Sequence, residues 1–133
     1  MALDIQGRER EGIAILDLKG RLVVGDSNLL REKVTEHSAA GKVNIALNLA
    51  EVDYIDSTGL GTMVICFTSL QKAGGRLKLE NLNRRTIELL VLTKLTTVFE
   101  LFNDEQDAVN SFFPDREIKR FDILSFVKDQ TGE

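Results

Sequence analysis

Alternating apolar and polar residues predict β-strands in this chain. In 43–49 every second residue is valine, isoleucine or leucine, which is the period of a strand with one buried face. In 12–19 apolar residues occupy both parities, so we expect a strand that is covered on both faces and closed by Gly20. Shorter strands are predicted at three further places, 3–8, 76–81 and 97–102.

Apolar residues at helical spacing predict four helices between and after these strands. Each helix is expected to start at a residue whose side-chain oxygen can accept a hydrogen bond from a free amide of the first turn. These starts are Asp26 or Ser27, Ser57, Asn83 and Asp104. The third helix is expected to reach Leu95, and Pro114 marks the end of the last one.

The predicted order is strand, strand, helix, and then three further strand–helix pairs. Strands that alternate with helices form crossover units, which imply a mostly parallel sheet. We therefore expect an α/β fold with one mostly parallel sheet of four to five strands and about four helices packed on it. The chain has 133 residues, a length that suits a single domain. We place this domain at 1–113 and a C-terminal extension at 114–133.

Composition narrows the function classes. Seventeen basic and 21 acidic residues give a net charge of −4, which argues against nucleic acid as the main partner. The sequence has no signal-peptide pattern at 1–10 and no apolar run of membrane-spanning length. Cys66 is the only cysteine, which excludes an intrachain disulfide and suits a reducing cytoplasm. We expect a cytoplasmic protein with no nucleic-acid or membrane partner, no cofactor and no bound metal.

The segment 52–64, VDYIDSTGLGTMV, places polar residues where a strand passes into a helix. The simplest interpretation is a helix cap made by Ser57. A catalytic serine needs a neighbouring base, and the only histidine, His37, belongs to another helix. A Walker phosphate loop needs a lysine after its glycines, and none follows Gly59 or Gly61. We therefore predict that the chain is not an enzyme and keep nucleotide binding as a minor alternative.

A further interpretation is that this junction receives a phosphate. A phosphoserine carries about −1.5 to −2 charge at neutral pH, and the positive end of a helix dipole tolerates such a charge. With Asp56 beside it, a phosphate on Ser57 would make the local field strongly negative. A partner docked over the junction would then be repelled.

The stretch YIDSTGLG and the later stretch GGRLKLENLNRR resemble the signature of STAS-domain anti-sigma factor antagonists. The resemblance extends over residues 3–113. It implies a bacterial protein that binds an anti-sigma factor, itself a serine kinase, and thereby frees a sigma factor. It also implies that the kinase phosphorylates the serine directly after the aspartate, which is Ser57, and that a PP2C-type phosphatase reverses this step.

The resemblance also suggests where the partner binds. We place the partner-binding surface at six residues: Asp26, Asp56, Ser57, Thr58, Gly59 and Leu60. We expect Gly59 and Gly61 to keep the turn open to the partner's backbone.

The loop after the second strand departs from the family pattern. Many family members carry two acids there, in the order Gly-Glu-Leu/Ile-Asp, whereas this chain has Gly-Arg-Leu-Val at 20–23. Asp26 either supplies a nearby carboxylate or acts as a plain helix cap. The alternative function is therefore a STAS interaction scaffold in a stress-signalling or transporter complex, without phosphorylation control.

The segment 114–133 lies beyond the resemblance. It mixes charged residues with several large apolar ones, an unusual composition for a disordered tail. Helix and strand spacings both fit it. We expect this tail to pack on this domain or, in a weak homodimer, on a second copy.

Overall fold

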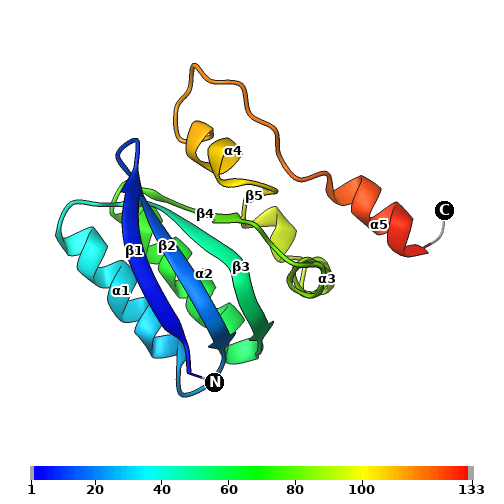
Figure 1. Cartoon of the computed structure of the whole chain (residues 1–133), viewed down its shortest axis with the longest axis horizontal. Helices are drawn as coiled ribbons and strands as arrows, with labels where there is room; N and C mark the ends of the chain where they lie inside the picture. Colours follow the sequence, from blue (N-terminus) through cyan, green and yellow to red (C-terminus); the bar gives the residue numbers. More distant parts are fainter. Residues whose placement is uncertain (1, 132–133) are drawn as a thin grey trace.

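The computed structural model describes residues 2–131 and shows a five-stranded sheet with helices packed on it (Figure 1). The strands are β1 (Asp4–Arg10), β2 (Ile13–Leu22), β3 (Asn44–Ile55), β4 (Arg76–Glu80) and β5 (Leu101–Phe102). The helices are α1 (Ser27–Ala39), α2 (Ser57–Lys72), α3 (Arg84–Leu92), the 3-10 turn η1 (Leu95–Thr97), α4 (Glu105–Asn110) and α5 (Ile123–Thr131). The strand order is β1-β2-β3-β4-β5, with β1 antiparallel to β2 and the other pairs parallel. The predicted α/β fold is confirmed.

The helices lie on both faces of the sheet. Each crossover from β2 to β5 moves one strand along the sheet in the same direction, so right-handed connections place α1, α2 and α3 on one face. The main core lies there and includes Leu30 of α1, Met63 of α2 and Leu90 of α3. On the other face, Val109 of α4 packs in a smaller cluster with Ile15 of β2. Figure 1 shows α1 and α2 side by side behind the first strands, with α4 at the top of the view.

The carboxyl ends of the parallel strands position the candidate site. Leu22 at the end of β2 pairs with Ile55 at the end of β3, so the β2–α1 loop lies next to the start of α2. Because β1 runs antiparallel to β2, with Asp4 opposite Lys19, the amino end of the described chain lies at the same edge (Figure 1). In open α/β sheets this edge is where ligands bind.

Some local predictions were wrong. Strand β2 does not close at Gly20: it continues to Leu22, because Gly20 adopts a φ of 109° at an irregularity in the β2–β3 register, a conformation that glycine permits. Helix α3 stops before Leu95, since Lys94 has a left-handed φ of 61° and starts η1. The strand predicted at 97–102 shrinks to β5, because its first residues complete η1 and a turn.

The predicted helix starts were partly confirmed. Asn83 and Asp104 each accept a hydrogen bond from a first-turn amide at 2.8 Å, as predicted. In α1 the preceding residue, Asp26, makes no capping hydrogen bond with its side chain. The cap of α2 is Asp56 and not Ser57, which is already the first helical residue. The predicted cap of α2 was therefore displaced by one residue.

The C-terminal extension packs on this domain, one of the two predicted alternatives. The Phe121 amide donates to the Leu101 carbonyl at 3.0 Å, and Phe121 and Ile123 pack against the main core. Arg120 forms an ion pair with Glu100 at 2.8 Å. The carbonyls of Glu100 and Phe102, on either side of Leu101, accept hydrogen bonds from the amides of Leu79 and Asn81. The Leu101 carbonyl therefore points away from β4. The extension thus covers the free edge of β5, while the domain boundary at 113/114 stays a prediction.

Candidate functional site

Asp56 joins the two segments that meet at the carboxyl edge of the sheet. Its Oδ1 accepts a hydrogen bond from the Gly59 amide at 2.8 Å, and its Oδ2 accepts one from the Val24 amide at 3.0 Å. Its own amide donates to the Leu22 carbonyl at 3.2 Å. The amides of Val24 and Gly59 hold the pKa of the carboxyl below its ordinary value, so Asp56 is ionised at neutral pH. One carboxylate therefore fixes the β2–α1 loop to the first turn of α2.

Ser57 and Thr58 form an exposed rim beside this carboxylate. Neither hydroxyl makes a hydrogen bond to any residue in the part of the chain that the structure describes. Because Asp56 provides the cap, the Ser57 hydroxyl can be modified without loss of a structural contact. It also lies at the amino end of α2, where the helix dipole is positive.

Gly59 and Leu60 lie beneath this rim and are buried. A Cβ atom at Gly59 would collide with the backbone carbonyl of Leu22, whereas one at Gly61 would meet open space. Gly59 is therefore needed for the close packing of α2 on β2. The expectation that Gly59 mainly keeps the turn open to a partner is replaced by this packing role. Direct partner contact by Gly59 and Leu60 stays a prediction.

Asp26 lies in the β2–α1 loop and is half-buried. Its amide donates to the Val23 carbonyl at 3.1 Å. Within residues 2–131 its carboxylate makes no hydrogen bond or ion pair. The bond from Val24 to Asp56 holds this loop against the start of α2. The structure thus brings all the predicted site residues to one edge of the sheet, although they come from segments about thirty positions apart in the sequence.

Sequence reasoning missed the exposed apolar residues around this edge. Val24 is 69% exposed and Tyr54 is 40% exposed. The Arg21 guanidinium lies 5.5 Å from the centroid of the Tyr54 ring, within cation–π range. Neighbouring exposed apolar side chains are typical of interaction surfaces. The available signal was the run of three apolar residues, Leu-Val-Val, immediately before Gly25.

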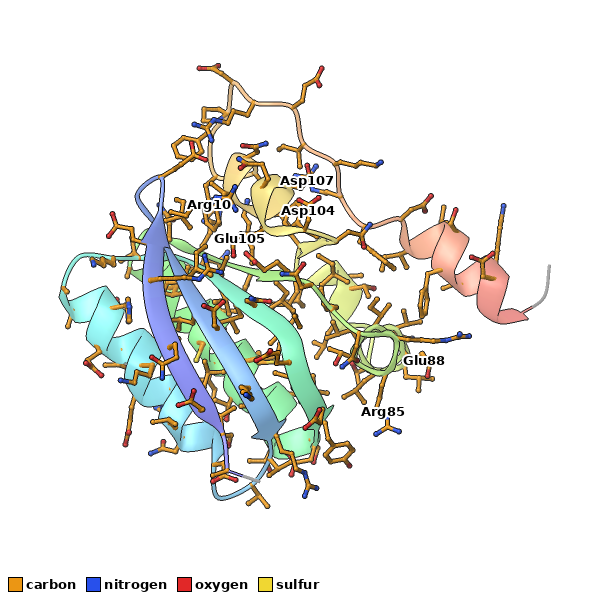
Figure 2. All side chains as sticks on the ribbon, viewed as in Figure 1. Arg10, Arg85, Glu88, Asp104, Glu105 and Asp107 are labelled. Atoms are coloured by element: carbon orange, nitrogen blue, oxygen red, sulfur yellow. The ribbon has the colours of Figure 1, made fainter. Side chains whose placement is uncertain are left out.

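A groove continues this surface from the end of β3 to α3. It has a volume of about 210 Å³, and its lining includes Tyr54, Leu89 and Leu92. Leu92 is 80% exposed. Figure 2 shows Arg85 and Glu88, which also line the groove, projecting outward from α3. An apolar groove with charges of both signs at its rim suits a protein surface as its partner.

The remaining reactive side chains lie elsewhere. His37 is in the last turn of α1, about 15 Å along that helix from the edge that holds Ser57. Its Nδ1 lies 2.8 Å from the Lys33 carbonyl oxygen. Cys66 is buried, and burial raises the pKa of its thiol to about 11. In the part of the chain that the structure describes, no three metal-ligating side chains form a group.

The chain matches one known protein family over most of its length. The STAS domain family matches residues 4–108. The anti-sigma-B factor antagonist of Bacillus subtilis is 34% identical over 109 residues, which cover 82% of this chain and 99% of that protein.

Solved structures share the fold. A crystal structure of an anti-sigma factor antagonist from Mycobacterium paratuberculosis matches with a TM-score of 0.71 at 18% identity, covering 83% of this chain and 93% of that one. The Bacillus cell fate determinant SpoIIAA in its phosphorylated form matches with a TM-score of 0.64 at 19% identity, covering 82% and 99%. Among residues 2–131, no helix has the length and apolar character needed to span a membrane.

Proposed function

Because this chain belongs to the STAS domain family, we propose that it is an anti-sigma factor antagonist whose partner binding is switched by phosphorylation of Ser57. The unmodified chain binds an anti-sigma factor that is also a serine kinase, and this binding releases a sigma factor. The kinase transfers the γ-phosphoryl group of ATP to the Ser57 hydroxyl, whose proton is lost, and a PP2C-type phosphatase removes the group by hydrolysis. The chain itself supplies a docking surface and a hydroxyl, without a catalytic group.

The free, exposed hydroxyl of Ser57 beside the Asp56 cap carries this proposal. The first turn of α2 is already capped, so a phosphate adds charge to the rim without competing for the Gly59 amide. The likeness to the anti-sigma-B factor antagonist supports the assignment. SpoIIAA, which shares the fold, has been solved in a phosphorylated form.

The effect of the phosphate on binding is electrostatic. A phosphoserine adds about −1.5 to −2 charge next to the ionised Asp56 and on the same edge as Asp26. A partner that covers this rim must face that charge and remove its water. A hundredfold loss of affinity requires about 2.7 kcal/mol, which repulsion and desolvation of a phosphate dianion can supply.

The charge around Ser57 bears on which partner fits. Arg21 stands where the resembled family often has an acid, and its guanidinium lies over the exposed ring of Tyr54. Val24 adds an exposed apolar group on the neighbouring loop. The partner is therefore expected to present apolar side chains and an acidic group opposite Arg21.

The test is phosphosite mapping after incubation with the cognate kinase and ATP, combined with calorimetry of both forms. We expect phosphate on Ser57 and an affinity at least about a hundredfold lower after modification. Ser57→Ala should bind the partner like the native chain and resist the kinase. Thr58→Ala is the matched control for the phosphorylation site, because it removes the neighbouring hydroxyl and should still be phosphorylated on Ser57.

Each part of the proposal can fail separately. Phosphate on Thr58 alone would refute the site. Equal affinity of the modified and unmodified forms would refute the switch and leave a STAS interaction scaffold without phosphorylation control. Absence of binding to any anti-sigma factor kinase from the source cell would refute the partner class.

A further inference from the structure

A layer of charged side chains lies on the sheet face that carries α4. Arg8 of β1 donates to Asp17 of β2 at 2.6 Å and to Glu105 of α4 at 2.9 Å. Arg10 of β1 pairs with the same Glu105 at 2.8 Å, and Figure 2 shows Arg10 and Glu105 close together. Two guanidinium groups therefore hold the carboxylate of Glu105.

Glu80 of β4 belongs to the same layer and is 0% exposed. Its Oε2 accepts a hydrogen bond from Asn81 Nδ2 at 3.3 Å. Its Oε1 is buried and, within residues 2–131, receives no hydrogen bond from an N–H or O–H group. A buried carboxylate without a cation of its own is strongly unfavourable, so such a group takes up a proton.

The carboxylate of Glu105 accepts the hydrogen bond that this proton makes. Helix α4, which carries Glu105, packs against β4, which carries Glu80, and the two carboxyls interact there. Two carboxyls share a hydrogen bond only when one of them is protonated. Arg8 foremost lowers the pKa of Glu105, whereas burial foremost raises the pKa of Glu80. The proton therefore resides on Glu80, which donates to Glu105.

We propose that this single proton fastens α4 to the sheet, and that its loss at high pH loosens α4. The charged groups on this face of the sheet and on α4 beside Glu80 are Arg8, Arg10, Asp17, Lys78 and Glu105. Arg8 is already shared between Asp17 and Glu105, so it does not neutralise a third carboxylate. An ionised Glu80 would repel the residue through which α4 is held.

The direction of the pH effect follows from comparison with the unfolded chain. Unfolded Glu80 ionises near its ordinary pKa of 4.5, whereas folded Glu80 keeps its proton to higher pH. Folding therefore becomes less favourable as the pH rises above about 4.5, until Glu80 ionises in the folded chain as well. Glu105 has the opposite sign: its pKa is lowered in the folded chain, so its stabilisation is lost as the pH falls below its ordinary value.

The first test compares melting temperatures across pH. Glu80→Gln removes the ionisable group and keeps an N–H donor for Glu105. The melting temperature of the native chain should fall by about 4 °C or more between about pH 6 and pH 9, while that of the variant stays nearly level. Glu36→Gln, which removes an exposed carboxylate of α1, is the matched control and should follow the native profile. Identical profiles for the native chain and Glu80→Gln would overturn the proposal.

The second test observes the proton in the native chain, so it does not depend on a variant. Carbon-13 NMR of the side-chain carboxyls should show Glu80 still protonated at neutral pH. Protection of the α4 amides from hydrogen exchange, corrected for the intrinsic rate, should fall at least about tenfold between about pH 6 and pH 9. A Glu80 that titrates at its ordinary value, or α4 protection that is constant over this range, would refute the proposal.

Discussion

At the scale of single residues, the two glycines that follow Thr58 have different environments. Gly59 is pressed against the Leu22 carbonyl, while Gly61, two positions later on the same helix, faces open space. The backbone of α2 can approach β2 this closely only because Gly59 has no side chain. The first glycine is therefore a packing requirement, and the second leaves room at the surface.

Alanine at each glycine separates these roles. Gly59→Ala should lower the free energy of unfolding by at least about 2 kcal/mol, because the new methyl group meets backbone that cannot move aside. Gly61→Ala should raise it by about 0.5 to 1 kcal/mol through better helix propensity. Urea denaturation measures both values. A stable Gly59→Ala protein with impaired partner binding would instead show that Gly59 acts at the interface.

At the scale of elements, one polar side chain both begins α3 and ties it to the sheet. Asn83 Oδ1 accepts from the Thr86 amide at 2.8 Å, and Asn83 Nδ2 donates to the Val52 carbonyl at 2.7 Å. Ile87 and Leu90 supply the buried face of the helix. Because α3 forms one wall of the groove beside Tyr54, the position of that wall depends on Asn83.

Two substitutions distinguish the cap from the cross-link. Asn83→Ala removes both hydrogen bonds and should cost about 2 kcal/mol of unfolding free energy, whereas Asn83→Ser keeps a capping oxygen and should cost about half as much. Chemical denaturation of the two variants gives the comparison. Equal losses would mean that the cap contributes nothing and that the bond to Val52 accounts for the whole effect.

Local signals account for the elements that could be predicted. The strict alternation of β3 and the caps of α3 and α4 are readable from neighbouring residues. The region after α3 was not, because the left-handed Lys94 and the burial of Phe99 depend on tertiary packing. Phe99 meets the ring of Phe67 edge-on at 5.6 Å, and no local period reports such a contact.

The position of the Ser57 hydroxyl could be predicted from the sequence, but the side chains around it could not. The signature locates Ser57, but the period of β3 does not say that Tyr54 stays exposed. The polar layer under α4 could not be predicted either, since Arg8 and Glu105 are 97 positions apart. These residues meet only because β1 pairs with β2 in the sheet and α4 packs on the face opposite α1, α2 and α3.

At the scale of the whole molecule, the two outer strands of the sheet, β1 and β5, need protection from pairing with other chains. The edge at β1 carries charged residues along its length, such as Asp4 and Arg8. The edge at β5 is short and is covered by the extension through the bond from Phe121 to Leu101. Uncovered strand edges are sites of unwanted association.

Ending the chain after Phe113 should therefore leave a cooperative fold with a lower melting temperature and more self-association. Calorimetry and sedimentation measure the two effects. Arg120→Ala in the full chain is the control: it removes the ion pair to Glu100 while the Phe121 bond to Leu101 remains, so self-association should not change. A truncated chain without a cooperative transition would place the extension within the domain core and contradict the boundary at 113/114.

The place of the amino end has a practical consequence for assay design. Ala2 lies close to Gly20, near the carboxyl ends of the parallel strands, where Ser57 also lies. Figure 1 shows this end of the chain far from α5. An affinity tag or fluorescent domain fused ahead of Ala2 would stand beside the proposed docking surface and weaken binding by bulk alone. Such a fusion would imitate the phosphorylated state in a reporter experiment. Immobilisation or labelling through the carboxyl-terminal side keeps that edge free, so a loss of signal can be attributed to the phosphate.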